Sequence, residues 1–291
     1  DILAHLAEGD VRKLAMEEPG YDGIRRVFEV NGLDIVPVSV GDEGIVMEEL
    51  ENVSADFLYL TPSHQFPTGS VTSAGRRRQL INWAEKTGTY IIEDDYDSEL
   101  RYYTSPIPAM QSLDVGGHTI YTGTFSKSLA PVMRTAYMIL PEKLMEKYRQ
   151  RYGRYNSMVS TFHQLTLAQF ISEGYYEQHI NRLRTMYRRK HAALLKAIAD
   201  VFGDRITVLG EGAGIHLLID VSSPFSQEEL VARAEKTGIR LYITKVLYAD
   251  REKCPNHRLL MGFPIVPTEA FEDIMKDLYR AWDMGRIEAD G

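Results

Sequence analysis

Residues 123–134 read Gly123-Thr-Phe-Ser-Lys-Ser-Leu-Ala-Pro-Val-Met-Arg134, and they follow the short apolar segment Thr119-Ile-Tyr-Thr122. An earlier apolar segment runs into acidic residues as Tyr90-Ile-Ile-Glu-Asp-Asp-Tyr96. A third, Phe57-Leu-Tyr-Leu60, runs into Thr61-Pro-Ser-His-Gln-Phe-Pro-Thr-Gly69. Buried, nearly continuous apolar strands with helical segments between them are typical of a mostly parallel sheet. Because ligands bind at the carboxyl ends of such strands, we expect these three polar runs to form one site.

The remaining periodicity extends this α/β pattern over the first half of the chain. Further strands are predicted at residues 14–17, 35–40 and 135–140, and a helix is predicted at residues 74–86. The connection before Thr135 is too short for a crossover helix, so we expect the last of these strands to run antiparallel to its neighbour.

The second half of the chain reads differently. From residue 141 to about residue 202 the periodicity is continuously helical, and strands and helices are mixed after it. This pattern predicts a large α/β domain at residues 1–145, incomplete at its N-terminus, and long helices with a smaller α+β domain at residues 146–291. The first residues, Asp1-Ile-Leu-Ala-His-Leu-Ala7, read as the middle of an amphipathic helix, so we expect them to continue a longer protein.

The composition is that of an ordinary globular protein, with 44% apolar and 25% charged residues among 291. A net charge of −8 argues against a nucleic-acid-binding surface, which needs clustered lysines and arginines. We interpret the basic run Arg76-Arg-Arg78 as a solvated helix face. No apolar run reaches the roughly 20 residues of a membrane helix. The single Cys254 excludes an internal disulfide, which favours a cytoplasmic setting.

Lys127 is the candidate for covalent chemistry, because a lysine that loses its proton can form a Schiff base with an aldehyde. Asp94 can pair with a protonated pyridine nitrogen, and Tyr96 can donate a hydrogen bond to a ring oxygen. Hydroxyls and a guanidinium fork suit a phosphate group. Three nearby residues offer them: Thr124, Ser126 and Arg134. Together these groups predict a pyridoxal 5′-phosphate site.

Simpler interpretations exist for each group. A Ser-Lys-Ser triplet by itself is typical of a surface loop, and Tyr96 can be a packed aromatic. Two of the acids in Glu93-Asp-Asp95 can cap a loop. The spacing of Asp94, Asp95 and Asp97 also resembles part of a divalent-metal site, although no glycine-containing calcium loop follows. We prefer the cofactor interpretation because three complementary sets of residues end successive strands.

Four motifs extend the comparison to a known family: Glu17-Glu-Pro-Gly-Tyr21, Thr61-Pro-Ser-His-Gln-Phe-Pro-Thr-Gly69, Glu93-Asp-Asp-Tyr-Asp-Ser-Glu99 and Gly123-Thr-Phe-Ser-Lys-Ser-Leu-Ala-Pro131. Over nearly the whole chain they resemble fold-type I pyridoxal-phosphate aminotransferases. The more specific likeness is to the aminotransferase-like effector domain of MocR/GabR-type bacterial transcriptional regulators. This resemblance implies a seven-stranded, mostly parallel sheet flanked by helices, and a homodimer. It also implies that DNA is bound only by a winged helix-turn-helix domain upstream of this chain.

The resemblance assigns the cofactor contacts position by position. Lys127 becomes the internal aldimine lysine, Asp94 the partner of the pyridine nitrogen, and Tyr96 the donor to the ring hydroxyl. Tyr21 stacks on the face of the ring. The phosphate ligands become Thr124, Ser126 and Arg134. A further turn of the family's phosphate site, at a helix N-terminus, is expected upstream of this chain.

The resemblance also implies substrate contacts and contains departures. Arg258 corresponds to the small-domain arginine that binds a substrate carboxylate, and His64 is a second candidate for substrate contact. Ordinary aminotransferases have asparagine where Phe66 stands, and phenylalanine cannot hydrogen-bond the ring hydroxyl. MocR-type domains share this phenylalanine. Tyr96 also follows Asp94 by two residues, where many aminotransferases have three.

Three functions are compatible with these motifs. The leading hypothesis is the effector domain of a GntR/MocR-type regulator, which senses an amino compound by aldimine formation at Lys127. The alternative is an active class I/II aminotransferase, in which Lys127 acts as the general base. A scaffold that has lost its cofactor is a third class, and the presence of Lys127, Asp94 and Arg134 argues against it.

Overall fold

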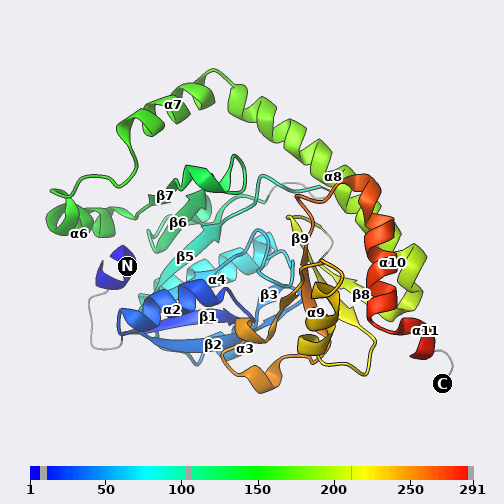
Figure 1. The fold of residues 1–291 in the computed structure, drawn as a ribbon. Coiled ribbons are helices and arrows are strands. Elements are labelled where there is room, and N and C mark those ends of the chain that lie inside the picture. The colour runs from blue at the N-terminus through cyan, green and yellow to red at the C-terminus, as the bar shows by residue number, and fades with distance from the viewer. Residues whose placement is uncertain (7–11, 103–106, 211, 288–291) are drawn as a thin grey trace. The chain divides into compact units, whose positions relative to one another are not determined.

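The computed structural model describes residues 1–6, 12–102, 107–210 and 212–287 of the chain (Figure 1). Two compact units divide it: the first comprises Asp1–Phe66, Ser70–Glu99 and Thr104–Asn181, and the second comprises Pro67–Gly69, Leu100–Tyr103 and Arg182–Gly291. Residues 146–181 thus belong to the first compact unit. The predicted domain boundary after residue 145 stays a prediction.

The first unit contains a seven-stranded sheet in the order β3-β2-β1-β4-β5-β6-β7. Its strands are β1 (Lys13–Glu18), β2 (Asp34–Gly41), β3 (Gly44–Ile45), β4 (Phe57–Leu60), β5 (Tyr90–Asp95), β6 (Thr119–Thr124) and β7 (Ala136–Ile139). The five central strands are parallel, and the edge strands β3 and β7 are antiparallel to their neighbours. The predicted mostly parallel sheet and the antiparallel last strand are confirmed, while β3 was not expected.

Helices cover both faces of this sheet (Figure 1). They are α1 (Ile2–Leu6), α2 (Asp22–Val30), α3 (Met47–Leu50), α4 (Ala74–Thr87), α5 (Met110–Leu113) and α6 (Glu142–Tyr152). The first unit also contains α7 (Thr161–Ser172) and the start of α8 (Tyr175–Phe202), which do not contribute to these two cores. The helix predicted at residues 74–86 is α4. It begins because the side chain of Ser73 accepts a hydrogen bond from the backbone N–H of Arg76, and it ends at Gly88, whose φ of +76° favours glycine.

The alternation of side chains along the parallel strands builds two apolar cores. In β4, Phe57 and Tyr59 pack on one face with residues of α1, α2 and α6. Leu58 and Leu60 of the same strand pack on the other face with residues of α3, α4 and α5. Successive residues of a strand point to opposite faces, so a strand that is apolar at every position is buried on both sides. This explains why the continuous apolar runs in the sequence predicted the sheet correctly.

The second unit has a four-stranded antiparallel sheet in the order β10-β11-β9-β8. Its elements are β8 (Ile206–Leu209), β9 (His216–Val221), β10 (Tyr242–Ile243), β11 (Arg258–Gly262), α9 (Gln227–Glu235), α10 (Phe271–Ala281), α11 (Met284–Ile287) and the rest of α8. Short 3₁₀ helices complete the chain: η1 (Pro131–Met133), η2 (Gly203–Arg205), η3 (Lys245–Leu247), η4 (Arg251–Lys253) and η5 (Thr268–Ala270). Among the described residues, none of the helices combines the length and apolar character needed to cross a bilayer.

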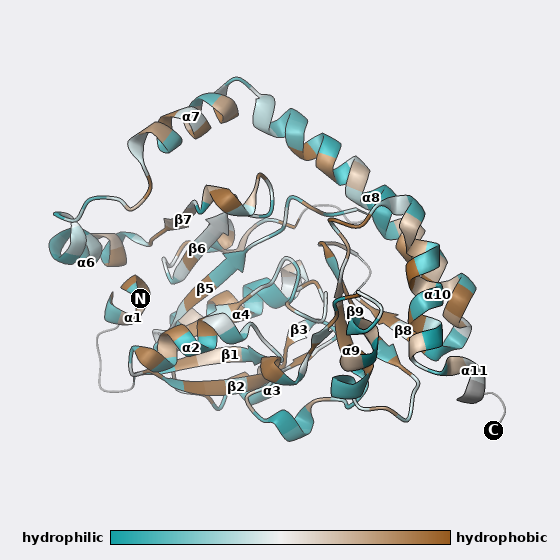
Figure 2. Cartoon of the chain, viewed as in Figure 1, coloured by the Kyte–Doolittle hydropathy of each residue, from teal (hydrophilic) through white to brown (hydrophobic). Residues whose placement is uncertain are grey.

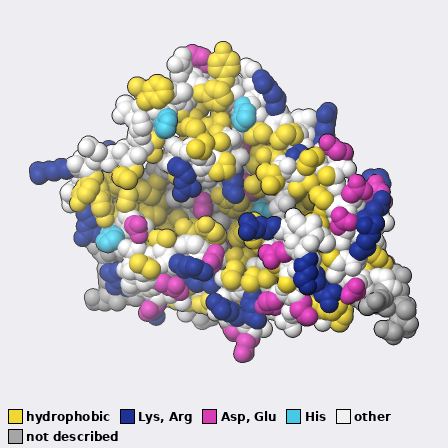
Figure 3. Space-filling model, viewed as in Figure 1, with side chains coloured by type: hydrophobic (Ala, Val, Ile, Leu, Met, Phe, Trp, Pro, Cys, Tyr) yellow, Lys and Arg dark blue, Asp and Glu magenta, His cyan; other side chains and the backbone are white. Residues whose placement is uncertain are grey.

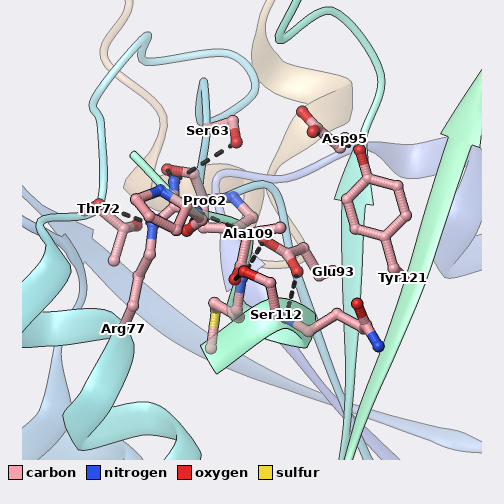
Figure 4. Close-up of polar contacts among 12 residues, drawn as sticks. Pro62, Ser63, Thr72, Arg77, Glu93, Asp95, Ala109, Ser112 and Tyr121 are labelled. Atoms are coloured by element: carbon pink, nitrogen blue, oxygen red, sulfur yellow. Dashed lines mark hydrogen bonds and ion pairs between the residues drawn. The ribbon is translucent and has the colours of Figure 1, made fainter. Parts of the chain in front are cut away.

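Arg77 of α4 is fully buried in the first unit, contrary to the prediction of a solvated basic run. Figure 4 shows its guanidinium group among backbone carbonyl oxygens and the carboxylate of Glu93. It donates to three carbonyls, those of Thr72 (3.1 Å), Pro62 (3.0 Å) and Pro108 (2.9 Å). Of the three arginines, Arg78 is exposed as expected for such a run, and Arg76 is half-buried. Arg77 therefore ties two segments to helix α4: the connection that follows β4 and the segment before α5.

Glu93 completes this cluster from β5. Its carboxylate lies 3.5 Å from Nη1 of Arg77 and accepts hydrogen bonds from the backbone N–H groups of Met110 (2.9 Å) and Gln111 (3.0 Å). These N–H groups belong to the first turn of α5, where a carboxylate satisfies otherwise unpaired donors. Both charged side chains are fully buried, so each compensates the other.

Replacing Arg77 by methionine is expected to lower the free energy of unfolding by about 3–5 kcal/mol, because it leaves the buried Glu93 carboxylate without its cation. The matched control is Arg78→Met on the same helix, which is expected to change stability by no more than about 0.5 kcal/mol. Chemical denaturation of both variants measures the difference. Equal stabilities of the two variants would contradict the structural role of Arg77.

Candidate functional site

The carboxyl ends of β1, β4, β5 and β6 meet at one edge of the first sheet, because these strands are parallel neighbours. Asp94 is the next-to-last residue of β5, and Thr124 is the last residue of β6. The polar run that begins at Thr61 directly follows β4, and Glu17 lies near the end of β1. The structure thus brings together the three runs that the sequence analysis selected, and it adds a fourth strand end.

Asp94 is held by two hydroxyl groups of neighbouring strands. The hydroxyl of Tyr59 donates to its Oδ2, and Oγ1 of Thr122 lies 3.3 Å from its Oδ1. Tyr59 pairs with Ile92 in the sheet register, and Asp94 lies two residues further along the same face. Burial raises the pKa of Asp94 from 3.8 to about 6, although these hydrogen bonds oppose the shift. Among the described residues, no lysine, arginine or histidine forms an ion pair with Asp94.

Glu17 is a second buried carboxyl group at this edge, and the sequence analysis gave it no role. Its Oε2 accepts hydrogen bonds from the backbone N–H (3.0 Å) and the hydroxyl (2.8 Å) of Thr61. Burial, despite these hydrogen bonds, raises the pKa of Glu17 from 4.5 to about 7, and the nearby Asp94 raises it further. The signal in the sequence was an acid at the end of a buried strand, which is the same signal that selected Asp94.

Lys127 and the predicted phosphate ligands lie on the connection from β6 to β7. Oγ1 of Thr124 lies 3.1 Å from Oγ of Ser126 and accepts the backbone N–H of that residue (3.2 Å). Lys127 is exposed, and within the described ranges its amine takes part in no hydrogen bond or ion pair. Arg134 is also exposed, and its backbone is left-handed with φ of +43°. A non-glycine residue in this region is uncommon, and such residues gather at functional sites.

Phe66 links the two tyrosines of the predicted site. Its ring meets Tyr21 edge-on at 5.9 Å between centroids and meets Tyr96 edge-on at 6.3 Å. Both contacts have the T-shaped geometry that aromatic pairs favour. Tyr21 is 48% exposed, so one face of the cluster is open to solvent. The structure therefore places an apolar ring between the two hydroxyl-bearing rings.

His64 is buried, and its imidazole faces Asp97 and Tyr96. Its Nδ1 lies 2.8 Å from Oδ2 of Asp97 and 3.1 Å from the hydroxyl of Tyr96. The Tyr96 hydroxyl also donates to the carbonyl oxygen of His64 at 2.9 Å. Asp97 was considered only as a possible metal ligand from the sequence. Substrate contact by His64 stays a prediction.

Arg258 lies in the second unit and is the first residue of β11. It pairs with Asp220 of β9 across the sheet, and its Nε and Nη2 each lie 2.7 Å from a carboxylate oxygen. This two-pronged contact raises the pKa of Arg258 above its usual value. Tyr248 is a further hydrogen-bonding neighbour of Arg258, and binding of a substrate carboxylate by this arginine stays a prediction.

The metal interpretation of the acidic run finds no support in the described part of the chain. No group of three or more histidine, cysteine, aspartate or glutamate side chains is arranged there to hold a metal ion. Glu93 instead caps α5, which was the simpler interpretation for one of these acids. Asp95 accepts a hydrogen bond from Tyr121 at 2.6 Å (Figure 4). Of the three acids Glu93, Asp94 and Asp95, Asp94 is therefore the candidate for binding a ligand.

Comparison with known proteins identifies the family. Residues 2–252 match the model of the family described as Aminotransferase class I and II. The chain belongs to this family. As an aminotransferase class I and II domain it also superposes on solved structures, among them a multiple substrate aminotransferase from Thermococcus profundus. That superposition has a TM-score of 0.87 at 22% identity and covers 98% of this chain and 73% of that one. It confirms the fold-type I architecture.

Two curated relatives of this aminotransferase domain are regulators. It is 40% identical over 281 residues to the uncharacterized HTH-type transcriptional regulator YdeL of Bacillus subtilis (strain 168), covering 97% of this chain and 60% of that protein. It is 34% identical over 241 residues to the probable rhizopine catabolism regulatory protein MocR of Rhizobium meliloti, covering 82% of this chain and 48% of that protein. These matches confirm the resemblance to MocR-type regulators. The chain spans about half to three fifths of these relatives.

Pyridoxal 5′-phosphate is the cofactor that this aminotransferase family implies, and the residues present fit it. Burial raises the pKa of the Asp94 carboxyl, and a protonated pyridine nitrogen is a positive partner that would favour its ionised form. The amine of Lys127 is available for an aldehyde. Hydroxyl groups and a guanidinium group lie on the same connection for a phosphate: Thr124, Ser126 and Arg134.

Glu17→Gln is expected to change how stability depends on pH. The folded state holds a proton on Glu17 up to a pKa of about 7, while the unfolded state loses it near 4.5, so the wild-type protein loses stability as pH rises between these values. Glutamine cannot ionise. The unfolding free energy of the variant, relative to wild type, should therefore rise by on the order of 3 kcal/mol between pH 4.5 and pH 8.

Denaturant titrations of the cofactor-free protein across this pH range measure the effect. Glu29→Gln on the exposed face of α2 is the control, and its difference from wild type should stay constant with pH. A difference for Glu17→Gln that is equally independent of pH would show that this carboxyl is ionised at little cost in the folded protein.

Proposed function

We propose that this chain is the effector-sensing part of a longer HTH-type transcriptional regulator. In this proposal it holds pyridoxal phosphate at Lys127, captures a small amino compound there, and passes the resulting change to a DNA-binding winged-helix domain elsewhere in the full-length protein. A cytoplasmic location follows from such a role. The observation that carries the proposal is the 40% identity to a regulator over 97% of this chain.

The geometry of the first unit supports specific roles for its residues. When bound, the cofactor supplies an aldehyde that condenses with amines and a ring that withdraws electrons. Lys127 holds the aldehyde carbon covalently, and Asp94 holds the ring nitrogen as an ion pair. Tyr21, which is half exposed beside Phe66, covers a face of the ring. Phosphate oxygens are bound by Thr124, Ser126 and Arg134.

The amino compound is expected to carry a carboxylate. Arg258 is oriented by Asp220 and has Tyr248 beside it, and a guanidinium group suits a planar contact with a ligand carboxylate. A ligand can bias the regulator only if it binds one of two protein states more tightly. The covalent contact with Lys127 is the contact in the first unit through which the ligand would do so.

Turnover is the second candidate function. Lys127 is exposed and carries the amine that, once released from the cofactor, would move a proton at the ligand Cα. This observation favours an active aminotransferase, and the fold match to such an enzyme agrees with it. The two candidates differ in whether product accumulates beyond one equivalent of protein.

A homodimer is part of the proposal, and α7 is its expected contact. Figure 2 shows hydrophobic residues along this helix, and Figure 3 shows hydrophobic side chains at the surface over it. Phe162 is 73% exposed and Leu165 is 66% exposed, and their spacing places them on one side of the helix. An exposed apolar helix face of this kind usually marks a protein interface. A second copy of this chain is the partner that the family resemblance implies.

The role of Lys127 is tested in the full-length protein supplied with cofactor. Wild type should show the visible absorbance of lysine-bound cofactor, and an amino compound from a panel should shift that absorbance and change affinity for operator DNA. Less than one keto acid per chain should form. Lys127→Ala should lose the visible absorbance and the DNA response, because no amine remains to bind the aldehyde.

The control for this experiment is Lys143→Ala, which removes an exposed lysine at the start of α6 and should leave both signals unchanged. If many keto acids form per chain and the panel has no effect on DNA affinity, the regulator function is rejected and the aminotransferase function is supported. Visible absorbance that persists in Lys127→Ala would overturn the assignment of the lysine itself.

Leu165→Asp is expected to weaken the dimer at least about 100-fold, because it places a charge in an interface that buries apolar side chains. Sedimentation velocity over a dilution series measures the dissociation constant. Val115→Asp, at a fully exposed apolar position in the turn before β6, is the matched control and should leave it unchanged. The α7 contact is wrong if the two variants dissociate alike.

A further inference from the structure

A buried pair of His64 and Asp97 lies beside the Tyr96 hydroxyl. The imidazole and carboxylate side chains are each only 1% exposed, and Nδ1 lies 2.8 Å from Oδ2. A carboxylate only accepts hydrogen bonds, so the proton between them is carried by Nδ1. The carboxylate thereby fixes which ring nitrogen of His64 is the donor.

The same nitrogen also faces Tyr96. The phenol oxygen lies 3.1 Å from Nδ1, and its own proton is donated to the carbonyl oxygen of His64 at 2.9 Å. Since the single Nδ1 proton is donated mainly to Asp97, the phenol oxygen is a second, longer acceptor of the same N–H. The oxygen of Tyr96 is thus held in place by His64, whereas its O–H bond can still rotate to another acceptor.

The surroundings of Tyr96 keep it a neutral phenol. Burial, and then the carboxylates that face it, raise the pKa of Tyr96 well above its usual value. These carboxylates come from β1 and from β5 with the residues after it: Glu17, Asp94, Asp95 and Asp97. Tyr59 of β4 is the other titratable group of this cluster. A neutral phenol is a hydrogen-bond donor, and Phe66, which packs against its ring, is not.

We propose that Asp97 and His64 are positioning residues for Tyr96, which hold its oxygen so that its proton can be given to the ring oxygen of the bound cofactor. This inference rests on the cofactor site of the proposed function. Without Asp97, Nδ1 of His64 is free to lose its proton and to accept one from Tyr96. The phenol proton is then turned toward the histidine and away from the cofactor.

The pH midpoint of the visible absorbance of lysine-bound cofactor reports this contact. A donor to the ring oxygen stabilises its negative charge, so loss of the donor makes the neighbouring imine nitrogen hold its proton to higher pH. Tyr96→Phe should raise the midpoint by about one pH unit, a tenfold change in the equilibrium. Asp97→Ala should raise it by a comparable amount, and Asp97→Asn, whose amide oxygen still accepts from Nδ1, should raise it much less.

A double variant separates positioning from a general structural effect. In the Tyr96→Phe background, Asp97→Ala should cause no further change, because the group that it positions is absent. If Asp97→Ala fails to fold, His64 carries the test. His64→Asn keeps an N–H donor close to the place of Nδ1 and should leave the midpoint near that of wild type, whereas His64→Leu should raise it.

The outcomes distinguish this inference from the proposed function. Absence of any visible absorbance in the full-length wild-type protein with cofactor defeats the cofactor site as a whole. If Tyr96→Phe raises the midpoint while Asp97→Ala and His64→Leu do not, only the positioning role is wrong. A shift for Asp97→Ala of the same size with and without the Tyr96 hydroxyl also overturns it, because that shift acts through another path.

Discussion

The first unit depends on one buried guanidinium group. Arg77 donates to three backbone carbonyls on two loops while Glu93 compensates its charge, and neither side chain reaches solvent. One of these loops begins at Pro62, between Thr61, which contacts Glu17, and His64, which contacts Tyr96. Arg77 therefore determines the position of the polar residues after β4 although it lies outside the site. Because a buried charge is tolerated only with its partners in place, this loop has one arrangement and not several.

The candidate site collects negative charge before it binds anything. Asp94 and Glu17 are buried carboxyl groups with raised pKa values near the ends of β5 and β1, the two strands that flank β4, and Asp97 is paired with His64. The available cations, Lys127 and Arg134, lie on the exposed connection after β6. A ligand with a positive ring nitrogen and a negative phosphate complements this arrangement, because the nitrogen suits the buried acids and the phosphate suits the exposed cations. Burial makes ionisation of these acids unfavourable, and binding of a positively charged group reduces that free-energy cost.

The sequence allowed prediction of the strands and their ends, because these follow from local, periodic patterns of apolar residues. Continuous apolar runs located the parallel strands, and their ends located Asp94 and Lys127, because strand ends collect ligand-binding groups. Arg77 was misread, since its burial results from loops that are distant in sequence. Tyr59 was treated only as part of an apolar strand, and its contact with Asp94 arises from the register of β4 with β5. The pairing of His64 with Asp97 likewise joins residues that are 33 positions apart.

Arg134, on the connection after β6, has a backbone conformation that is unfavourable for an arginine. Glycine adopts a φ of +43° without strain, whereas an arginine there costs roughly 1 kcal/mol or more in conformational energy. The residue also ends η1 and leads directly into the backbone hydrogen bond between Phe125 and Thr135. An arginine at a position that suits glycine therefore supplies a positive charge at a cost in conformational free energy. A glycine there would relax the backbone of this connection and at the same time remove its exposed cationic side chain.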